Sequence, residues 1–103
     1  MMPEIRMLGA RDEALLRHVA PGVFDHAPKP ALIAEFLRDG RHHLAVTIED
    51  GTVIGFASGV HYVHPDKPSE LWINEVGVAP SHHRRGIGKA IIEALLQHAK
   101  RLG

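Results

Sequence analysis

The sequence contains no cysteine among its 103 residues, and its 12 basic residues are balanced by 12 acidic ones. Without cysteine there is no disulfide framework, thiolate metal site or cysteine nucleophile, which agrees with a reducing, cytoplasmic location. With no formal net charge, the chain lacks the broad positive field that nucleic-acid binding requires, so we expect any bound anion to be held locally. The amino-terminal residues lack a long apolar run, so we expect neither a signal peptide nor a membrane span.

A chain of this length builds a single hydrophobic core, so we expect one domain over residues 1–103. Its apolar segments alternate between strand and helix periods and are separated by glycine and proline. We expect strands over 5–8, 44–48, 52–60 and 71–78, a helix capped by Asp12, a second helix from Pro30 that is capped by Gly40, and a third helix over 87–102. Asp50-Gly51 predicts a tight hairpin turn. The order is therefore β-α-α-β-β-β-α, an α/β (α+β) domain with a mixed sheet.

The segment "SHHRRGIGKA" (81–90) stands between a predicted strand and the last predicted helix. A helix start leaves its first amides unpaired and carries the positive end of the helix dipole, so it attracts anions. Glycines at 86 and 88 let a ligand reach the backbone, and Arg84, Arg85 and Lys89 add three positive charges that oppose the dipole. This combination favours a phosphate site; the alternative is a tight turn with solvated arginines.

Two common phosphate motifs do not fit this segment. A Walker A loop needs glycine where His83 stands and a hydroxyl where Ala90 stands. The dinucleotide fingerprint needs a third glycine where the chain has Ile91. We therefore expect neither nucleoside triphosphate hydrolysis nor nicotinamide binding.

The segment "VGVAPSHHRRGIGKAIIEALLQHAKRLG" resembles the acetyl-coenzyme A binding segment of the GNAT superfamily of N-acetyltransferases, whose signature is [QR]-x-x-G-x-[GA]. Residues 83–88, "HRRGIG", match at Gly86 and Gly88, with His83 where Gln or Arg is usual. Residues 23–80 are similar in layout to the aminoglycoside 3-N-acetyltransferases of that superfamily. The resemblance implies the N-terminal portion of a GNAT-like fold, acetyl-CoA as co-substrate and a primary amine, such as an aminoglycoside, as acceptor.

The resemblance also implies roles for individual residues. Glu75 is the candidate general base, although an outward-facing strand glutamate or Asn74 in its place are open alternatives. The amide of Val76 or a neighbour would stabilise the oxyanion, and the edge of that strand would pair with pantetheine. The cofactor-binding residues are then Val76, Gly77, Val78, His83, Arg84, Arg85, Gly86, Ile87, Gly88 and Lys89.

Members of the superfamily usually continue beyond this last helix, which would make this chain a truncated domain without a recognisable general acid. Its uncovered strand edge predicts a homodimer or higher oligomer. Three classes stay open: an N-acetyltransferase, a non-catalytic coenzyme A binding module, and a structural α/β interaction domain.

Nine histidines raise the question of a metal site. Neighbouring histidines on a strand point to opposite faces, and no zinc spacing is present, so we expect no metal. His61, Tyr62 and His64 are candidates for the acceptor pocket, with core or rim packing as the alternative for the tyrosine and for Trp72. Asp25 and Glu70 are candidates for contact with a polycationic acceptor.

Overall fold

The computed structural model describes residues 3–102. Eight elements follow one another along this part of the chain: β1 (Glu4–Met7), the 3-10 helix η1 (Glu13–Arg17), α1 (Pro30–Arg38), β2 (His42–Glu49), β3 (Thr52–Tyr62), β4 (Glu70–Val78), the 3-10 turn η2 (Pro80–His82) and α2 (Ile87–Leu102). The predicted class and the predicted order of elements are confirmed, with the first helix in the tighter 3-10 form. The bounds predicted for the last helix are confirmed as well.

The four strands form one sheet in the order β1-β2-β3-β4. All three pairings between these strands are antiparallel, so the expected mixed sheet is corrected. The only parallel pairing within residues 3–102 is an isolated bridge between Val19 and Val53. Sequential strands that are also neighbours in the sheet pair antiparallel because short connections return the chain beside itself.

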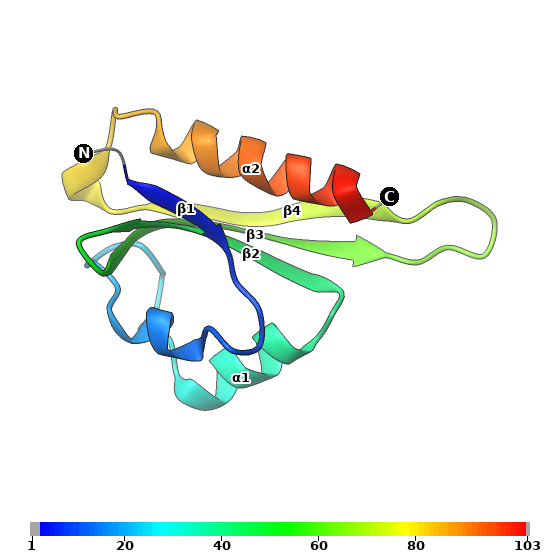
Figure 1. The fold of residues 1–103 in the computed structure, drawn as a ribbon, viewed down its shortest axis with the longest axis horizontal. Coiled ribbons are helices and arrows are strands. Elements are labelled where there is room, and N and C mark those ends of the chain that lie inside the picture. Colours follow the sequence, from blue (N-terminus) through cyan, green and yellow to red (C-terminus); the bar gives the residue numbers. More distant parts are fainter. Residues whose placement is uncertain (1–2, 103) are drawn as a thin grey trace.

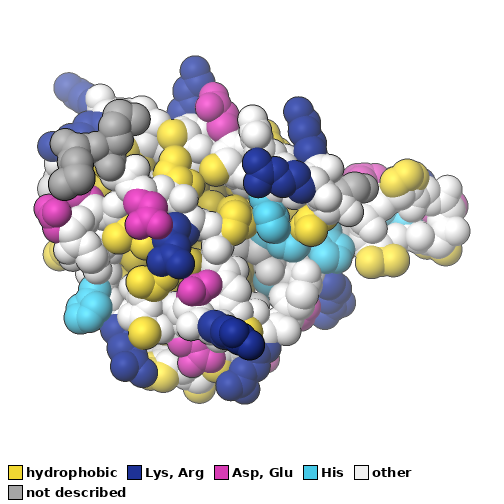
Figure 2. Space-filling view, viewed as in Figure 1, with side chains coloured by type: hydrophobic (Ala, Val, Ile, Leu, Met, Phe, Trp, Pro, Cys, Tyr) yellow, Lys and Arg dark blue, Asp and Glu magenta, His cyan; other side chains and the backbone are white. Residues whose placement is uncertain are grey.

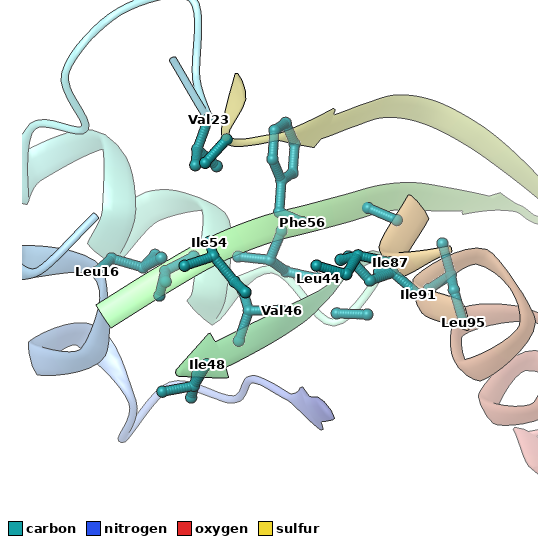
Figure 3. Packing of buried hydrophobic residues seen from close by; sticks show 14 of the residues in the cluster. Leu16, Val23, Leu44, Val46, Ile48, Ile54, Phe56, Ile87, Ile91 and Leu95 are labelled. Carbon is teal, nitrogen blue, oxygen red and sulfur yellow. The ribbon is translucent and has the colours of Figure 1, made fainter. Parts of the chain in front are cut away.

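The sheet separates two layers of helix (Figure 1). Helix α2 covers one face, and η1 and α1 cover the other. Ile91 and Leu95 of α2 are completely buried, and Leu16 of η1 is buried on the other side of the sheet (Figure 3). Ile33 of α1 is buried as well. The apolar spacing in the sequence therefore corresponds to the buried face of each α-helix. The buried apolar residues on the two faces of the sheet form one hydrophobic cluster.

The hairpin turn is confirmed at Asp50 and Gly51. Both residues have positive φ, 51° and 76°, and Glu49 pairs with Thr52 across the two-residue loop. Positive φ at both central positions is the geometry that matches the twist of the flanking strands. Local turn chemistry was thus sufficient to locate this connection.

One predicted cap is confirmed in position and the other is wrong. Asp12 is the N-cap residue of η1, but its carboxylate accepts a 2.7 Å hydrogen bond from the Gly9 N–H and makes no capping bond to the helix. Helix α1 ends at Arg38 with Asp39, not Gly40, as its C-cap, and the Asp39 carboxylate accepts hydrogen bonds from the Arg41 amide and guanidinium at 3.0–3.2 Å. These bonds lower the pKa of Asp39 to about 2. Because a carboxylate and a guanidinium organise this corner, a left-handed glycine is not needed there.

The hairpin formed by β3 and β4 extends beyond the body of the domain (Figures 1 and 2). On this arm Tyr62 and Trp72 meet edge to face at 6.2 Å, and both rings are half exposed. They are therefore rim aromatics of the arm. Among residues 3–102, no helix has both the length and the apolar character that crossing a membrane requires.

Candidate active site

A β-bulge in β4 sets the direction of the candidate catalytic side chain. Ser58 of β3 pairs with Glu75 and Gly59 pairs with Ile73, so Asn74 is an extra residue without a partner on β3. A bulge shifts the alternation of side chains between the two faces. As a result Glu75, and not Asn74, lines the cavity between the sheet and α1.

The outer edge of β4 has no neighbouring strand within residues 3–102. The Ala79 N–H donates to the Ile54 carbonyl at 2.8 Å, toward β3. Because backbone groups alternate along a strand, the N–H groups of Val78 and Val76 point to the open edge. His83 Nε2 donates to the Val78 carbonyl at 2.9 Å, which occupies one acceptor there. The amide of Val76, predicted as an oxyanion donor, stays accessible on the exposed edge.

The turn before α2 presents backbone amides. Arg84 and Gly86 both have positive φ, 67° and 73°, and the first bond of the helix is the one from the Ala90 N–H to the Gly86 carbonyl at 3.1 Å. Within residues 3–102 the amides of 84–89 have no backbone acceptor. Successive amides around such a turn form a concave anion site. Ile87 is buried, so only its backbone can take part.

The three cations of this turn are not equivalent. Glu49, at the end of β2, accepts a 2.9 Å hydrogen bond from His82 Nε2 and lies 3.8 Å from an Arg85 guanidinium nitrogen. In the part of the chain that the structure describes, neither Arg84 nor Lys89 has a carboxylate within 4.0 Å. Arg85 therefore forms an ion pair that helps attach the turn to the end of β2, whereas Arg84 and Lys89 are available to a ligand. The sequence could not indicate this, because Glu49 and His82 are 33 residues apart.

This contact predicts a pH dependence of stability. The hydrogen bond from His82, aided by the charges of His82 and Arg85, lowers the pKa of Glu49 below its usual 4.5. A depressed carboxyl pKa stabilises the fold above the unfolded-state pKa, and this contribution is lost as the pH falls through the folded-state pKa. We expect Glu49→Gln to lower the urea midpoint at pH 7 and to differ less from wild type at pH 3. Glu93→Gln, at an exposed position of α2, is the control; an equal pH response of the two variants would contradict the role of Glu49.

The cavity that contains Glu75 has a volume of about 360 Å³ and lies between the sheet, α1 and the loop after η1. Asp25, a predicted acceptor contact, also lines it, and so does Ser58, which the sequence analysis did not select. Ser58 is only 5% exposed. A buried hydroxyl within the apolar run of β3 was the signal that could have indicated it. Predicted contacts that lie outside this cavity are His61, Tyr62, His64 and Glu70.

Two of those residues line a separate groove under the C-terminal half of α2. His61 and Glu70 lie there with His43 and His98. His43 Nε2 is 2.8 Å from His61 Nδ1, and burial, followed by the neighbouring imidazoles, lowers the pKa of His43. Residues 3–102 contain no group of three or more metal-ligating side chains placed to hold an ion. We therefore assign this groove no part in the reaction.

Comparison with known proteins identifies the family to which the chain belongs. The model of the GNAT acetyltransferase family matches residues 12–103, so the chain belongs to the GNAT acetyltransferases. Members of this family use acetyl-CoA. A curated relative, the mycothiol acetyltransferase of Thermomonospora curvata, is 34% identical over 100 residues, which cover 95% of this chain and 30% of the relative. The chain spans less than half the length of the curated relatives it matches.

Solved structures share the fold. A soil metagenomic aminoglycoside acetyltransferase in complex with sisomicin superposes with a TM-score of 0.83 at 18% identity, covering 99% of this chain and 72% of that one. The aminoglycoside N-acetyltransferase AAC(6′)-Iy in complex with CoA gives a TM-score of 0.72 at 22% identity, covering 98% and 71%. At these identities the likeness concerns the fold alone.

Proposed function

We propose that this chain transfers the acetyl group of acetyl-CoA to a primary amine. The observation that carries the proposal is the convergence of three features at one end of the sheet: the open edge of β4, the amide-rich turn before α2, and the cavity that contains Glu75. The edge and the turn suit the two parts of coenzyme A, and the cavity suits the acceptor. The cytoplasmic location that we propose agrees with the lack of cysteine.

The turn and the strand edge fit coenzyme A in its two parts. The amides of residues 84–89 and the side chains of Arg84 and Lys89 would hold the pyrophosphate. The amide-bearing pantetheine arm would pair with the outer edge of β4 at Val76, because His83 already occupies the Val78 carbonyl. Gly86 supplies the positive φ that turns these amides toward one point.

The chemistry requires a neutral amine beside the thioester. Glu75 would take a proton from the substrate ammonium, directly or through a water molecule, which leaves the nitrogen lone pair to attack the carbonyl carbon. The Val76 N–H would donate to the developing oxyanion. The new C–N bond then replaces the C–S bond, the nitrogen releases its second proton to solvent, and the coenzyme leaves as a thiolate that is protonated by solvent. The proposal thus uses groups that lie next to each other on β4.

Arg84→Glu tests the phosphate site. Removing a charge-assisted hydrogen bond of about 1.5–3 kcal/mol should weaken CoA binding roughly tenfold to a hundredfold. Isothermal titration calorimetry with CoA measures this, and Arg11→Glu, at an exposed position in the loop before η1, is the control. Unchanged affinity of Arg84→Glu would remove the phosphate assignment. A wild-type chain that does not bind CoA would leave only the structural-domain reading, whereas binding without thiol release from any amine would leave a binding module.

We further propose that this chain associates into a homodimer or higher oligomer through the N-terminal half of the β4 edge, which leaves Val76 free for pantetheine. That half carries open backbone groups beside Trp72 (58% exposed) and Ile73 (41%). Exposed apolar edge strands pair readily with another copy, and lysine on the edge prevents it. We expect sedimentation velocity at micromolar concentration to show a dimer that Ile73→Lys converts to monomer. A wild-type chain that sediments as a monomer would overturn the proposal.

The acceptor within the class of primary amines is a finer question. The resemblance suggested an aminoglycoside, acetylated at the 3-N position. A structural neighbour was solved with the aminoglycoside sisomicin, which supports the broader idea of an amine acceptor for the fold. The aminoglycoside and its 3-N position rest on the resemblance alone, and the position of the acetyl group in the product tests them.

A further inference from the structure

The walls of the acceptor cavity are apolar. Phe24, from the loop after η1, stacks on Phe56 of β3 with ring centroids 4.1 Å apart and an interplanar angle of 24°. Leu32, Ile33 and Phe36 of α1 and Leu44 of β2 are among the other apolar residues that line it. Such a lining binds most favourably to a ligand with an apolar surface, because both surfaces are then removed from water. It offers few partners for a ligand that carries many hydroxyl groups.

Five polar side chains line the cavity. Ser58 and Glu75 are directly opposite each other on β3 and β4, and Asp25, His26 and Lys29 come from the segment that leads into α1. Ser58 is 5% exposed and lines the cavity, and its hydroxyl takes part in none of the side-chain hydrogen bonds found within residues 3–102. A buried hydroxyl beside a carboxylate suits one ammonium group, with the hydroxyl oxygen accepting and the carboxylate neutralising.

One wall residue is incompletely covered by protein. Leu32 lines the cavity from α1 and yet is 59% exposed, one of the most exposed large apolar side chains that the structure describes. Its neighbour on the same helix, Ile33, is 8% exposed. An apolar side chain at the mouth of an apolar cavity contributes more to a ligand complex than to the fold.

From these observations we infer the class of acceptor, an inference that rests on the proposed function: a primary amine carried on an apolar body, aromatic or branched aliphatic, and not a polyhydroxylated amine. The ammonium lies between Glu75 and Ser58, with Ser58 as a positioning residue. The hydrocarbon body lies against Phe24, Phe56 and Leu32. A polyhydroxylated acceptor would leave most of its hydroxyl groups against hydrocarbon, where they lose their bonds to water without replacement.

The test uses two probes of opposite character, 2-phenylethylamine and kanamycin. We expect 2-phenylethylamine to be acetylated with a kcat/KM at least about tenfold above that of kanamycin, measured as thiol release from acetyl-CoA. Leu32→Ser should raise the KM for 2-phenylethylamine about tenfold with little change in kcat, since it removes binding and not chemistry. Leu96→Ser is the matched control, because Leu96 is an exposed leucine of α2 on the other face of the sheet. Ser58→Ala should impair the reaction, and Ser58→Thr should restore part of it.

A binding experiment separates this inference from the proposed function. Titration of 2-phenylethylamine into the CoA-bound chain, followed by NMR, should shift the resonances of the cavity residues. The dissociation constant obtained from these shifts should be about tenfold higher for Leu32→Ser than for wild type. Such binding without thiol release would contradict the acetyltransferase activity and support the acceptor class. Preference for kanamycin, or equal affinity of wild type and Leu32→Ser, would overturn the acceptor class while leaving CoA-dependent acetylation intact. Absence of any 2-phenylethylamine binding would overturn it as well.

Discussion

Glu75→Gln is expected to lower kcat about 10²–10⁴-fold, the usual contribution of a positioned general base. The amide keeps the size of the side chain and its place opposite Ser58 but cannot accept the ammonium proton. The affinity for CoA should be unchanged, because its predicted contacts lie at the turn before α2 and along the edge of β4. The measurement is thiol release under saturating acetyl-CoA and amine, with calorimetry of CoA on the same variant.

Glu70→Gln is the matched control for this prediction. Glu70 begins the same strand, is paired with Lys67 at 3.0 Å, and does not line the acceptor cavity. Its replacement should leave kcat within about twofold of wild type, as for a surface side chain away from the chemistry. If Glu75→Gln turned over as fast as Glu70→Gln, another group would have to take the proton.

Gly77→Ala is expected to be the most destabilising single methyl addition in the sheet. A Cβ at position 77 would lie 2.2 Å from the Val23 carbonyl oxygen and 2.7 Å from a ring carbon of Phe56. The loop backbone at Val23 must move for this methyl to fit, so we expect a loss at or above the upper end of the roughly 1–3 kcal/mol typical of overpacking. Thermal unfolding should show a clear drop in Tm.

Gly40→Ala provides the comparison. Position 40 has open space around an added Cβ and no positive φ, so its Tm should stay close to that of wild type. Equal Tm values for the two variants would show that the contact between β4 and the Val23 loop is loose. Gly77 was selected in the sequence for its place in a cofactor-binding segment. Its packing suggests a second reason for glycine, namely that the loop beside the acceptor cavity approaches β4 this closely.

The parts of the fold that the sequence predicted correctly are those set by local signals. Asp50-Gly51 fixes a hairpin because these two residues tolerate positive φ, and the apolar spacing from Ile87 onward fixes α2 because one helical face must be buried. The helix ends were predicted less well, because Asp12 is at the N-cap position without a side-chain capping bond and Asp39 takes the C-cap position predicted for Gly40. In both cases the aspartate nearby had a better donor within three residues.

The candidate site was predicted less completely, because its geometry arises from contacts between distant segments. Glu75 was identified by its place before Gly77, but only the bulge at Asn74 determines that Glu75 lines the cavity. Ser58 had no motif around it. The attachment of Arg85 and His82 to Glu49 joins segments that are far apart in the sequence, which no pattern in either segment indicates.

The bulge at Asn74 has a consequence for the whole of β4. Ile73 is opposite Gly59 and Val76 is opposite Ala57, so both apolar side chains share the α2 face although three positions separate them. A regular strand would have put one of the two on the opposite surface. One extra residue therefore keeps the apolar side chains at both ends of β4 on the α2 face while Glu75, between them, lies on the opposite face. Deleting the extra residue would reverse the faces of the side chains on one side of the bulge.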